Sequence, residues 1–304
     1  MKKNIKKNHL LVIGGTGFIG HHILNYGKKS NWKLTSISRR IPKHDRRIYG
    51  VKYLIIDIKK HELFKKKINN NFTHVVNVAG ISGKVFEKKK FIFYEYLKSI
   101  KFIMNFFCKK EIKKFIQVGS ASEYGSLKTP QRENLICHPK TNYGKANLSA
   151  TKYLLKLSKI NSFPGIAVRL FQVYGKNQNE HQIIPYVIKK TINKEKIKLS
   201  RGSQTRDFCH IDDVVKAIFK LLNTKKYNGE IFNIASGNDI SIKNLVKLII
   251  NQVGFGEPKF GEINIKKDEI YRSKASIMKI KKLIDWKPKI NLKFGIRKLI
   301  KKYK

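Results

Sequence analysis

The sequence predicts an α/β protein with a doubly wound parallel sheet and a smaller, mixed α/β C-terminal lobe. Short apolar runs of strand length alternate with longer amphipathic stretches that have helical periodicity. Most of the short runs are continuously apolar, which is typical of parallel strands buried on both faces. Such strands alternating with helices favour a doubly wound sheet over a sandwich or a bundle.

The expected elements follow this alternation. Strands are expected at 9–13, 34–38, 53–56, 74–78, 115–118 and 165–170, with helices at 17–27, 93–108 and 143–160. After residue 175 the pattern loosens, with helices expected at 183–193, 211–222, 242–253, 277–284 and 294–301. Strands are expected there at 197–199 and 231–234, and a loop is expected before 211. We therefore expect a first domain at 8–175 and a smaller lobe mainly at 176–304, with parts of 208–236 returning to the first domain.

The composition is ordinary for a folded protein except for its charge. The formal net charge is +46, and lysines are spread over almost every segment without a recognisable nucleic-acid-binding motif. An A/T-rich coding sequence explains much of this excess, so we expect no dedicated nucleic-acid role, and a basic RNA-associated protein is the alternative. The three cysteines have no metal-ligand or disulfide spacing, and no stretch reaches about 18 apolar residues. We expect a cytoplasmic protein without a metal site or a membrane span.

A glycine-rich motif follows the first expected strand directly. The sequence GGTGFIG at 14–20 opens the next helix. Glycines there permit a tight turn and a close backbone approach to a pyrophosphate, and the helix N-terminus offers its amides to phosphates. Strand, motif and helix in this order predict a Rossmann-type dinucleotide site. Its expected residues are Gly14, Gly15, Thr16, Gly17, Phe18, Ile19 and Gly20.

The end of the second expected strand indicates the type of dinucleotide. An acidic residue there binds the ribose of NAD, whereas a basic residue accommodates the extra phosphate of NADP. This sequence has Ser38, Arg39 and Arg40 and no acid. We favour NADP(H), with NAD(H) as the alternative if these arginines form only a solvated basic loop.

Over nearly its whole length the sequence resembles the extended short-chain dehydrogenase/reductase family, in particular its nucleotide-sugar epimerases, dehydratases and 4-keto reductases. The matching motifs are GGTGFIG, YLIIDI, NVAG at 77–80, VGSASEYG at 118–125, RLFQVYG at 169–175, GSQTRDFCHIDDV at 202–214, FNIASG and DWKP. The resemblance implies cofactor contacts at Asp57, Ile58, Ala79 and Gly80. It also implies a nucleotide sugar as substrate, with Ser120 as the catalytic Ser/Thr and Arg206 at the diphosphate, and we expect a homodimer.

The family's Tyr-x-x-x-Lys pair is incomplete in this sequence. Tyr143 takes the tyrosine position, but Asn147 stands four residues later, where the family's lysine binds the nicotinamide ribose and lowers the pKa of the tyrosine. Lys145 lies about 200° around the helix from Tyr143 and cannot simply substitute. Without the ammonium, Tyr143 would stay protonated at neutral pH. That state can donate a proton to a ketone oxygen, so reduction is favoured over oxidation or epimerisation, and a cofactor-binding scaffold without catalysis is the alternative.

The residues around Ser120 narrow the reaction further. Dehydratases of the family carry an acid at the position of Ser122, and Glu123 comes one residue later, pointing elsewhere in a strand. We therefore expect NADPH-dependent reduction of a 4-keto group on a nucleotide-linked 6-deoxyhexose, in cell-surface polysaccharide biosynthesis, with a nucleotide-sugar 4-epimerase as the second candidate. Residues that could tune the sugar pocket by the same resemblance are Ser120, Ser122, Tyr143, Gln172, Gln182 and, in place of a common Asn, Tyr96.

Overall fold

The computed structural model describes residues 8–68, 72–80, 90–265 and 269–303. By its internal contacts the chain divides into two compact units. Unit 1 is Met1–Glu123, Thr141–Arg169 and Ile218–Phe232, and unit 2 is Tyr124–Lys140, Leu170–Ala217 and Asn233–Lys304. Each unit is therefore built from three separate pieces of the chain.

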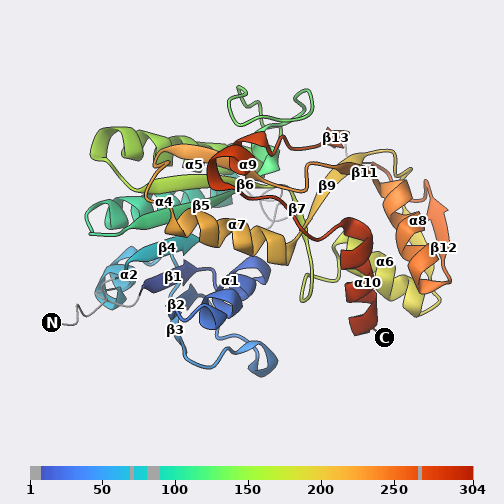
Figure 1. The fold of residues 1–304 in the computed structure, drawn as a ribbon, viewed down its shortest axis with the longest axis horizontal. Helices are drawn as coiled ribbons and strands as arrows, with labels where there is room; N and C mark the ends of the chain where they lie inside the picture. Colours follow the sequence, from blue (N-terminus) through green and yellow to red (C-terminus); the bar gives the residue numbers. More distant parts are fainter. Residues whose placement is uncertain (1–7, 69–71, 81–89, 266–268, 304) are drawn as a thin grey trace. The chain divides into compact units, whose positions relative to one another are not determined.

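Unit 1 centres on a seven-stranded sheet in the order β10-β6-β5-β4-β1-β2-β3 (Figure 1). Residue Leu11 in β1 pairs in parallel with Thr35 in β2 and with Val75 in β4. The strand order changes direction at β1, and in such sheets ligands bind beyond the carboxyl ends of the strands at this point. The strands are β1 (His9–Ile13), β2 (Lys33–Ser38), β3 (Val51–Ile55), β4 (His74–Asn77), β5 (Lys114–Ser120), β6 (Gly165–Leu170) and β10 (Glu230–Ile234).

Helices cover this sheet on both faces. One layer consists of α2 (His61–Lys67), α4 (Lys90–Cys108) and α5 (Asn142–Asn161), which bury Phe64, Met104 and Leu154 in one core cluster with Leu11 and Phe115 of the sheet. The other layer contains α1 (Phe18–Lys29) and the C-terminal half of α7 (Ile211–Asn223). These two helices meet through the rings of Tyr26 and Phe219, whose centroids are 4.7 Å apart. The expected doubly wound sheet is confirmed.

A lysine is buried at the amino-terminal end of strand β5. Lys114, the first residue of β5, is 1% exposed. Its ammonium donates to the carbonyl oxygen of Lys226, 3.1 Å away, and to the side-chain oxygen of Asn228. These bonds hold the segment between α7 and β10 against the sheet, and burial lowers the pKa of Lys114 to about 8.

Unit 2 is the expected mixed α/β lobe. In its larger sheet, β9 (Thr205–His210) pairs antiparallel with β11 (Asp239–Ser241) and parallel with β7 (Gln172–Tyr174) and β13 (Arg272–Ser273). A second, parallel pair joins β8 (Lys196–Leu199) to β12 (Glu257–Phe260). The helices α6 (Ile183–Ile192), α8 (Ile242–Val253) and α10 (Leu292–Tyr303) share one apolar core, and α9 (Met278–Ile284) precedes α10.

The expectation of a loop before α7 is wrong, because strand β9 lies there. Its sequence TRDFCH lacks the alternation of apolar and polar residues that is typical of a half-buried strand. A charged residue, Asp207, takes a completely buried position in it. The Asp207 carboxylate accepts hydrogen bonds from the backbone amides of Ser236, Gly237 and Ala275 and from the Ser236 hydroxyl. A buried carboxylate with this many donors is compatible with a strand, although its sequence gives no strand signal.

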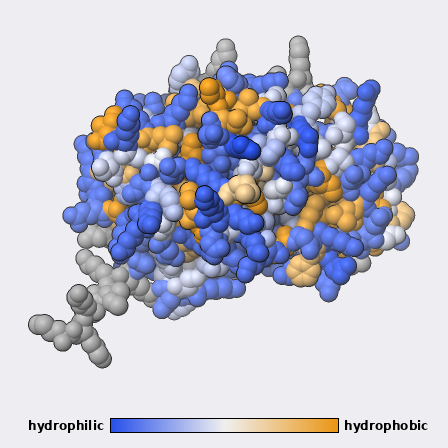
Figure 2. Space-filling model, turned by 45° about the horizontal axis from the view of Figure 1, so that its top comes forward, coloured by the Kyte–Doolittle hydropathy of each residue, from blue (hydrophilic) through white to orange (hydrophobic). Residues whose placement is uncertain are grey.

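The face of the molecule drawn in Figure 2 is predominantly hydrophilic. Figure 2 shows hydrophilic side chains over most of the face in view, with apolar side chains in separate groups between them. Among the residues that the structure describes, no helix combines the length and the apolar character needed to cross a bilayer.

Candidate active site

The glycine motif forms a tight turn between β1 and α1. Gly14 has a φ of +90°, and a Cβ atom there would lie 2.8 Å from the amide nitrogen of Ala79. At Gly20 a Cβ atom would lie 2.3 Å from the carbonyl oxygen of Gly14. The N-cap residue of α1 is Gly17, which has no side chain to accept a hydrogen bond from the first amides of the helix. The turn therefore presents a helix N-terminus suited to an anion.

A pocket of about 230 Å³ lies in front of this turn, at the carboxyl ends of β1, β2, β3 and β4. Nine of the expected cofactor residues line it, namely Gly14, Thr16, Gly17, Ser38, Arg39, Asp57, Ile58, Ala79 and Gly80. The remaining wall comes from Ile37, Ile56, Lys59, Val78, Tyr96 and Ser99. The structure thus brings together, in one pocket, residues that are up to 85 positions apart, from Gly14 to Ser99.

The rim of the pocket after β2 and β3 carries positive charge. The backbone amide of Thr16 donates to the Ser38 hydroxyl at 3.1 Å, which joins the glycine turn to the end of β2. Arg39 lines the pocket with an exposed side chain, whereas Arg40 is exposed outside the lining. Lys59, which the sequence analysis missed, adds a second exposed cation, and its amide donates to Asp57 at 3.0 Å.

Tyr96 helps to shape the wall after β4. Its hydroxyl donates to the carbonyl oxygen of Ala79 at 3.2 Å, and its side chain is 3% exposed. The amide of Ala79 in turn donates to the side chain of Asn77 at 3.1 Å, and Asn77 donates to Gln117 of β5 at 2.8 Å. Tyr96, which the sequence analysis considered for the sugar pocket, therefore lies in the wall of the dinucleotide pocket.

The expected catalytic serine and tyrosine meet at the end of β5. Ser120 is the last residue of β5, and Tyr143 lies in the first turn of α5. Thr141 is the N-cap residue of this helix, and its hydroxyl accepts a hydrogen bond from the amide of Gly144 at 3.0 Å. The side chain of Ser120 lies close enough to that of Tyr143 to lower the pKa of the phenol. The Ser122 hydroxyl lies 2.6 Å from the Ser120 hydroxyl. A substrate oxygen placed here would meet two hydroxyl groups in addition to the phenol.

The environment of Tyr143 favours the protonated phenol. Burial raises its pKa above the ordinary value, the hydrogen bond with Ser120 lowers it, the charge of Glu123 raises it, and a hydrogen bond with Asn147 lowers it. These four causes include no lysine and no arginine from the described part of the chain. The phenol therefore carries its proton at neutral pH.

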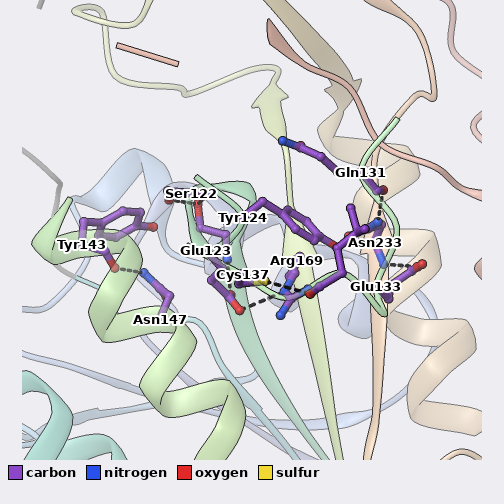
Figure 3. Close-up of polar contacts among 12 residues, drawn as sticks. Ser122, Glu123, Tyr124, Gln131, Glu133, Cys137, Tyr143, Asn147, Arg169 and Asn233 are labelled. Carbon is purple, nitrogen blue, oxygen red and sulfur yellow. Dashed lines mark hydrogen bonds and ion pairs between the residues drawn. The ribbon is translucent and has the colours of Figure 1, made fainter. Parts of the chain in front are cut away.

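Asn147 stands at the lysine position of the family, but its shorter side chain binds the backbone of its own helix. Its side chain is buried, and its amide group donates to the backbone carbonyl oxygen of Tyr143 at 2.8 Å, as Figure 3 shows. Lys145, two residues before it, is exposed. The helix therefore presents an amide, not an ammonium, next to the tyrosine.

Glu123 has a contact that the sequence analysis missed. It lies in a 3-10 turn, η2 (Ala121–Glu123), and not in a strand. The carboxylate is completely buried and pairs with Arg169 of β6 at 2.9 Å. The signal that could have predicted this pair is an arginine inside the apolar run of β6, because a buried guanidinium needs an anionic partner.

The three expected substrate residues beyond residue 170 all belong to unit 2. Gln172 begins β7 and Gln182 caps α6, and both are exposed. Arg206 lies in β9, donates to the carbonyl oxygen of Thr205 at 2.7 Å and forms an ion pair with Glu269. Burial lowers the pKa of Arg206, and the charge of Glu269 opposes this. Glu269 lies 63 residues away from Arg206 along the chain, and no pattern in the sequence indicates this pairing.

A Rossmann sheet with a glycine turn, a pocket at the carboxyl ends of its strands and a Ser-Tyr pair is typical of an enzyme of the NAD(P)-dependent class. The model of the NAD dependent epimerase/dehydratase family matches residues 10–235, and the chain belongs to this family.

Relatives span nearly the whole chain. The chain is 29% identical over 303 residues to a putative UDP-glucose 4-epimerase of Methanocaldococcus jannaschii, covering 96% of this chain and 97% of that protein. It is 28% identical over 320 residues to a dTDP-4-dehydro-6-deoxyglucose reductase of Escherichia coli, covering 97% and 98%. The fold is similar to that of a UDP-glucose 4-epimerase from Thermotoga maritima solved with UDP-glucose, with a TM-score of 0.91, 22% identity and coverage of 96% and 97%.

Proposed function

We propose that the chain reduces the 4-keto group of a nucleotide-linked 6-deoxyhexose with NADPH. The observation that carries this proposal is the Tyr143 phenol beside Ser120, which has a raised pKa and, one helical turn along α5, an amide where the family has an ammonium. Reduction of a ketone needs a proton donor, which this phenol is. The similarity to a dTDP-4-dehydro-6-deoxyglucose reductase supports the same reaction type.

In the proposed reaction each residue has a separate task. The dinucleotide, when bound, supplies a hydride to the carbonyl carbon. Tyr143 donates its proton to the carbonyl oxygen as negative charge develops there, and the Ser120 hydroxyl holds that oxygen by a hydrogen bond. The proton is later restored from solvent, so one hydride and one proton convert the ketone to an alcohol.

The cofactor preference rests on charge at the pocket rim. Arg39 and Lys59 both line the pocket. The end of β2, where an acid would favour the unphosphorylated ribose of NAD, carries Ser38, Arg39 and Arg40 instead. A guanidinium can bind a phosphate through two charge-assisted hydrogen bonds. We therefore assign NADPH as the preferred dinucleotide, with Arg39 as its main phosphate contact.

The proposal is tested by mixing the purified protein with NADPH and a panel of 4-keto nucleotide sugars. Loss of the NADPH absorbance together with formation of the 4-hydroxy sugar is expected for at least one of them. Binding of NADPH without turnover of any 4-keto sugar would instead assign the chain as a dinucleotide-binding scaffold.

A 4-epimerase is the second candidate, because a putative UDP-glucose 4-epimerase is similar over almost the whole chain. An epimerase would interconvert UDP-glucose and its 4-epimer with no net consumption of dinucleotide. Incubation with UDP-glucose, followed by separation of the two sugars, distinguishes this activity from reduction.

A further inference from the structure

A buried ion pair lies directly behind the end of β5. The Arg169 guanidinium donates from Nε to the Oε2 oxygen of Glu123 at 2.9 Å, and the two side chains are 3% and 0% exposed. All six residues of β6, which carries Arg169, are buried. Figure 3 shows the two side chains meeting. The pair is therefore shielded from water, where the loss of either charge has a large effect.

The second oxygen of Glu123 holds the backbone of Ser120. The amide of Ser120 donates to Oε1 at 3.0 Å. The preceding residue is a glycine, and a Cβ atom at Gly119 would lie 2.2 Å from Oε1, so the close approach requires glycine there. Burial raises the pKa of Glu123, whereas the charge of Arg169 and the hydrogen bond from the Ser120 amide oppose this rise. Both carboxylate oxygens accept hydrogen bonds from N–H groups, which stabilise the ionised form.

The same carboxylate also lies against the helix that carries the tyrosine. Thr151 of α5 lies beside Glu123 and follows Tyr143 by two helical turns. Glu123 thus joins the end of β5, the interior of β6 and the inner face of α5. A shift of this carboxylate would move Ser120 relative to Tyr143.

The charge of Glu123 also acts on the phenol. Of the residues that the structure describes, Ser120 from β5, Asn147 from α5 and Glu123 from η2 shift the pKa of Tyr143, and Tyr96 from α4 interacts electrostatically with it. Among these groups Glu123 is the charged one, and its charge raises the pKa of Tyr143. The carboxylate therefore favours the state of the phenol that donates a proton.

We propose that Glu123, held in place by Arg169, is a positioning residue that fixes the Ser120 backbone and so sets the Ser120 hydroxyl against Tyr143. This inference rests on the proposed transfer of a proton from Tyr143. Glu123 is not one of the residues that line the pocket, and its described hydrogen bonds join it to Ser120 and Arg169, so its effect passes through the Ser120 backbone and through its charge.

The first test is the variant Glu123→Gln, which keeps the shape of the side chain and an acceptor oxygen but removes the charge. We expect kcat to fall about ten- to a hundredfold, because small misplacements of reacting groups have effects of this order. The KM for the sugar and the Kd for NADPH should change by less than about twofold, since neither pocket loses a contact. The alkaline limb of the pH-rate profile should move to lower pH, because a negative charge beside the phenol is gone.

Two further variants separate positioning from stability. The double variant Glu123→Gln with Arg169→Gln removes both charges and should fold even if an unpaired Arg169 prevents folding of the single variant, while still moving the alkaline limb. The control is Asp213→Asn in unit 2, a carboxylate that is likewise fully buried and accepts backbone amides, from Lys289 at 2.9 Å and Ile290 at 2.8 Å. It should reduce stability and leave both kcat and the pH limb unchanged.

A readout without turnover keeps this test independent of the proposed function. In protein with ¹³C-labelled tyrosine, the Cζ resonance of Tyr143 is identified by its loss in Tyr143→Phe. This resonance should change in Glu123→Gln and in the double variant but not in Asp213→Asn. An unchanged resonance and an unchanged kcat would overturn the inference. A changed resonance in a protein that reduces no 4-keto sugar would overturn the proposed function alone.

Discussion

Asn147 donates from its side-chain amide to the backbone carbonyl oxygen of Tyr143 at 2.8 Å, one helical turn back along α5. The residue that replaces the family's lysine is therefore engaged with its own helix, and the phenol of Tyr143 has a pKa above its ordinary value. This relationship makes the acid-base behaviour of the site open to a direct test.

Asn147→Lys should lower the pKa of Tyr143, because an ammonium on the same helix face stabilises the phenolate. For reduction, which needs the protonated phenol, the alkaline limb of the pH-rate profile should move to lower pH. Tyr143→Phe should reduce kcat by about 10²–10⁴ in either background. The control Ser149→Lys adds the same charge at a half-buried position of α5, two residues after Asn147 and so on another face of the helix, and should leave the limb in place. A limb that responds equally to both lysines would contradict the assignment of Tyr143.

Arg39→Ala should weaken NADPH binding roughly tenfold or more, since hydrogen bonds to charged groups contribute about 1.5–3 kcal/mol. NADH binding should change little, because it lacks the phosphate. Arg40→Ala is the matched control, being an exposed neighbour outside the pocket lining, and should have the smaller effect. Calorimetric titration with both dinucleotides measures this. Equal loss of NADPH and NADH affinity would show that Arg39 does not contact the extra phosphate.

Arg206 and Glu269 should affect substrate binding in opposite directions. Arg206→Lys should raise the KM for the nucleotide sugar roughly tenfold, because lysine does not reproduce the planar, bidentate contact with a diphosphate. Glu269→Gln should lower this KM by about twofold to fivefold, the effect expected from removing a partly exposed ion pair that competes with the diphosphate. Both variants should leave NADPH binding unchanged. If both raise the KM, Glu269 orients the arginine rather than competing for it.

Lys114 should make stability depend on pH in a defined window. Its pKa is about 8 in the folded chain, against an ordinary value of 10.5, so the folded state binds a proton less readily than the unfolded state. The destabilisation is complete below pH 8 and disappears as pH rises towards 10.5. Relative to Lys114→Met, the wild type should therefore gain stability between about pH 8 and pH 10.5, measured by urea unfolding. A constant difference across this window would mean that the ammonium is not desolvated.

The sequence predicts the regular elements of the fold well where local signals are strong. The bounds of β1, β6 and α8 agree with the expected ones. The apolar run of β1 ends at Gly14, and that of β6 starts at Gly165. Helix α8 lies between its N-cap Ser241 and its C-cap Gly254. The glycine turn and the meeting of Ser120 with Tyr143 were also expected, the latter only through the family resemblance.

The elements and contacts that were missed depend on partners far away in the sequence. Strand β9 is stabilised by bonds from Asp207 to residues around 236 and 275. Glu123 and Arg169 are 46 residues apart, and Arg206 and Glu269 are 63 apart. Local patterns in charge or hydrophobicity do not encode which carboxylate meets which guanidinium, since this depends on the path of the folded chain.

The division of the chain between the two units limits how the protein can be cut and recombined. The chain passes from one unit to the other after residues 123, 140, 169, 217 and 232. Three of these passages fall inside β6, α7 and β10, so each of these elements begins in one unit and ends in the other. A single nick therefore releases neither unit as an intact fragment. Exchange of the second unit with that of a relative would need five joints, three of them within regular secondary structure, so new specificities are expected to arise in this chain by point substitution rather than by swapping of modules.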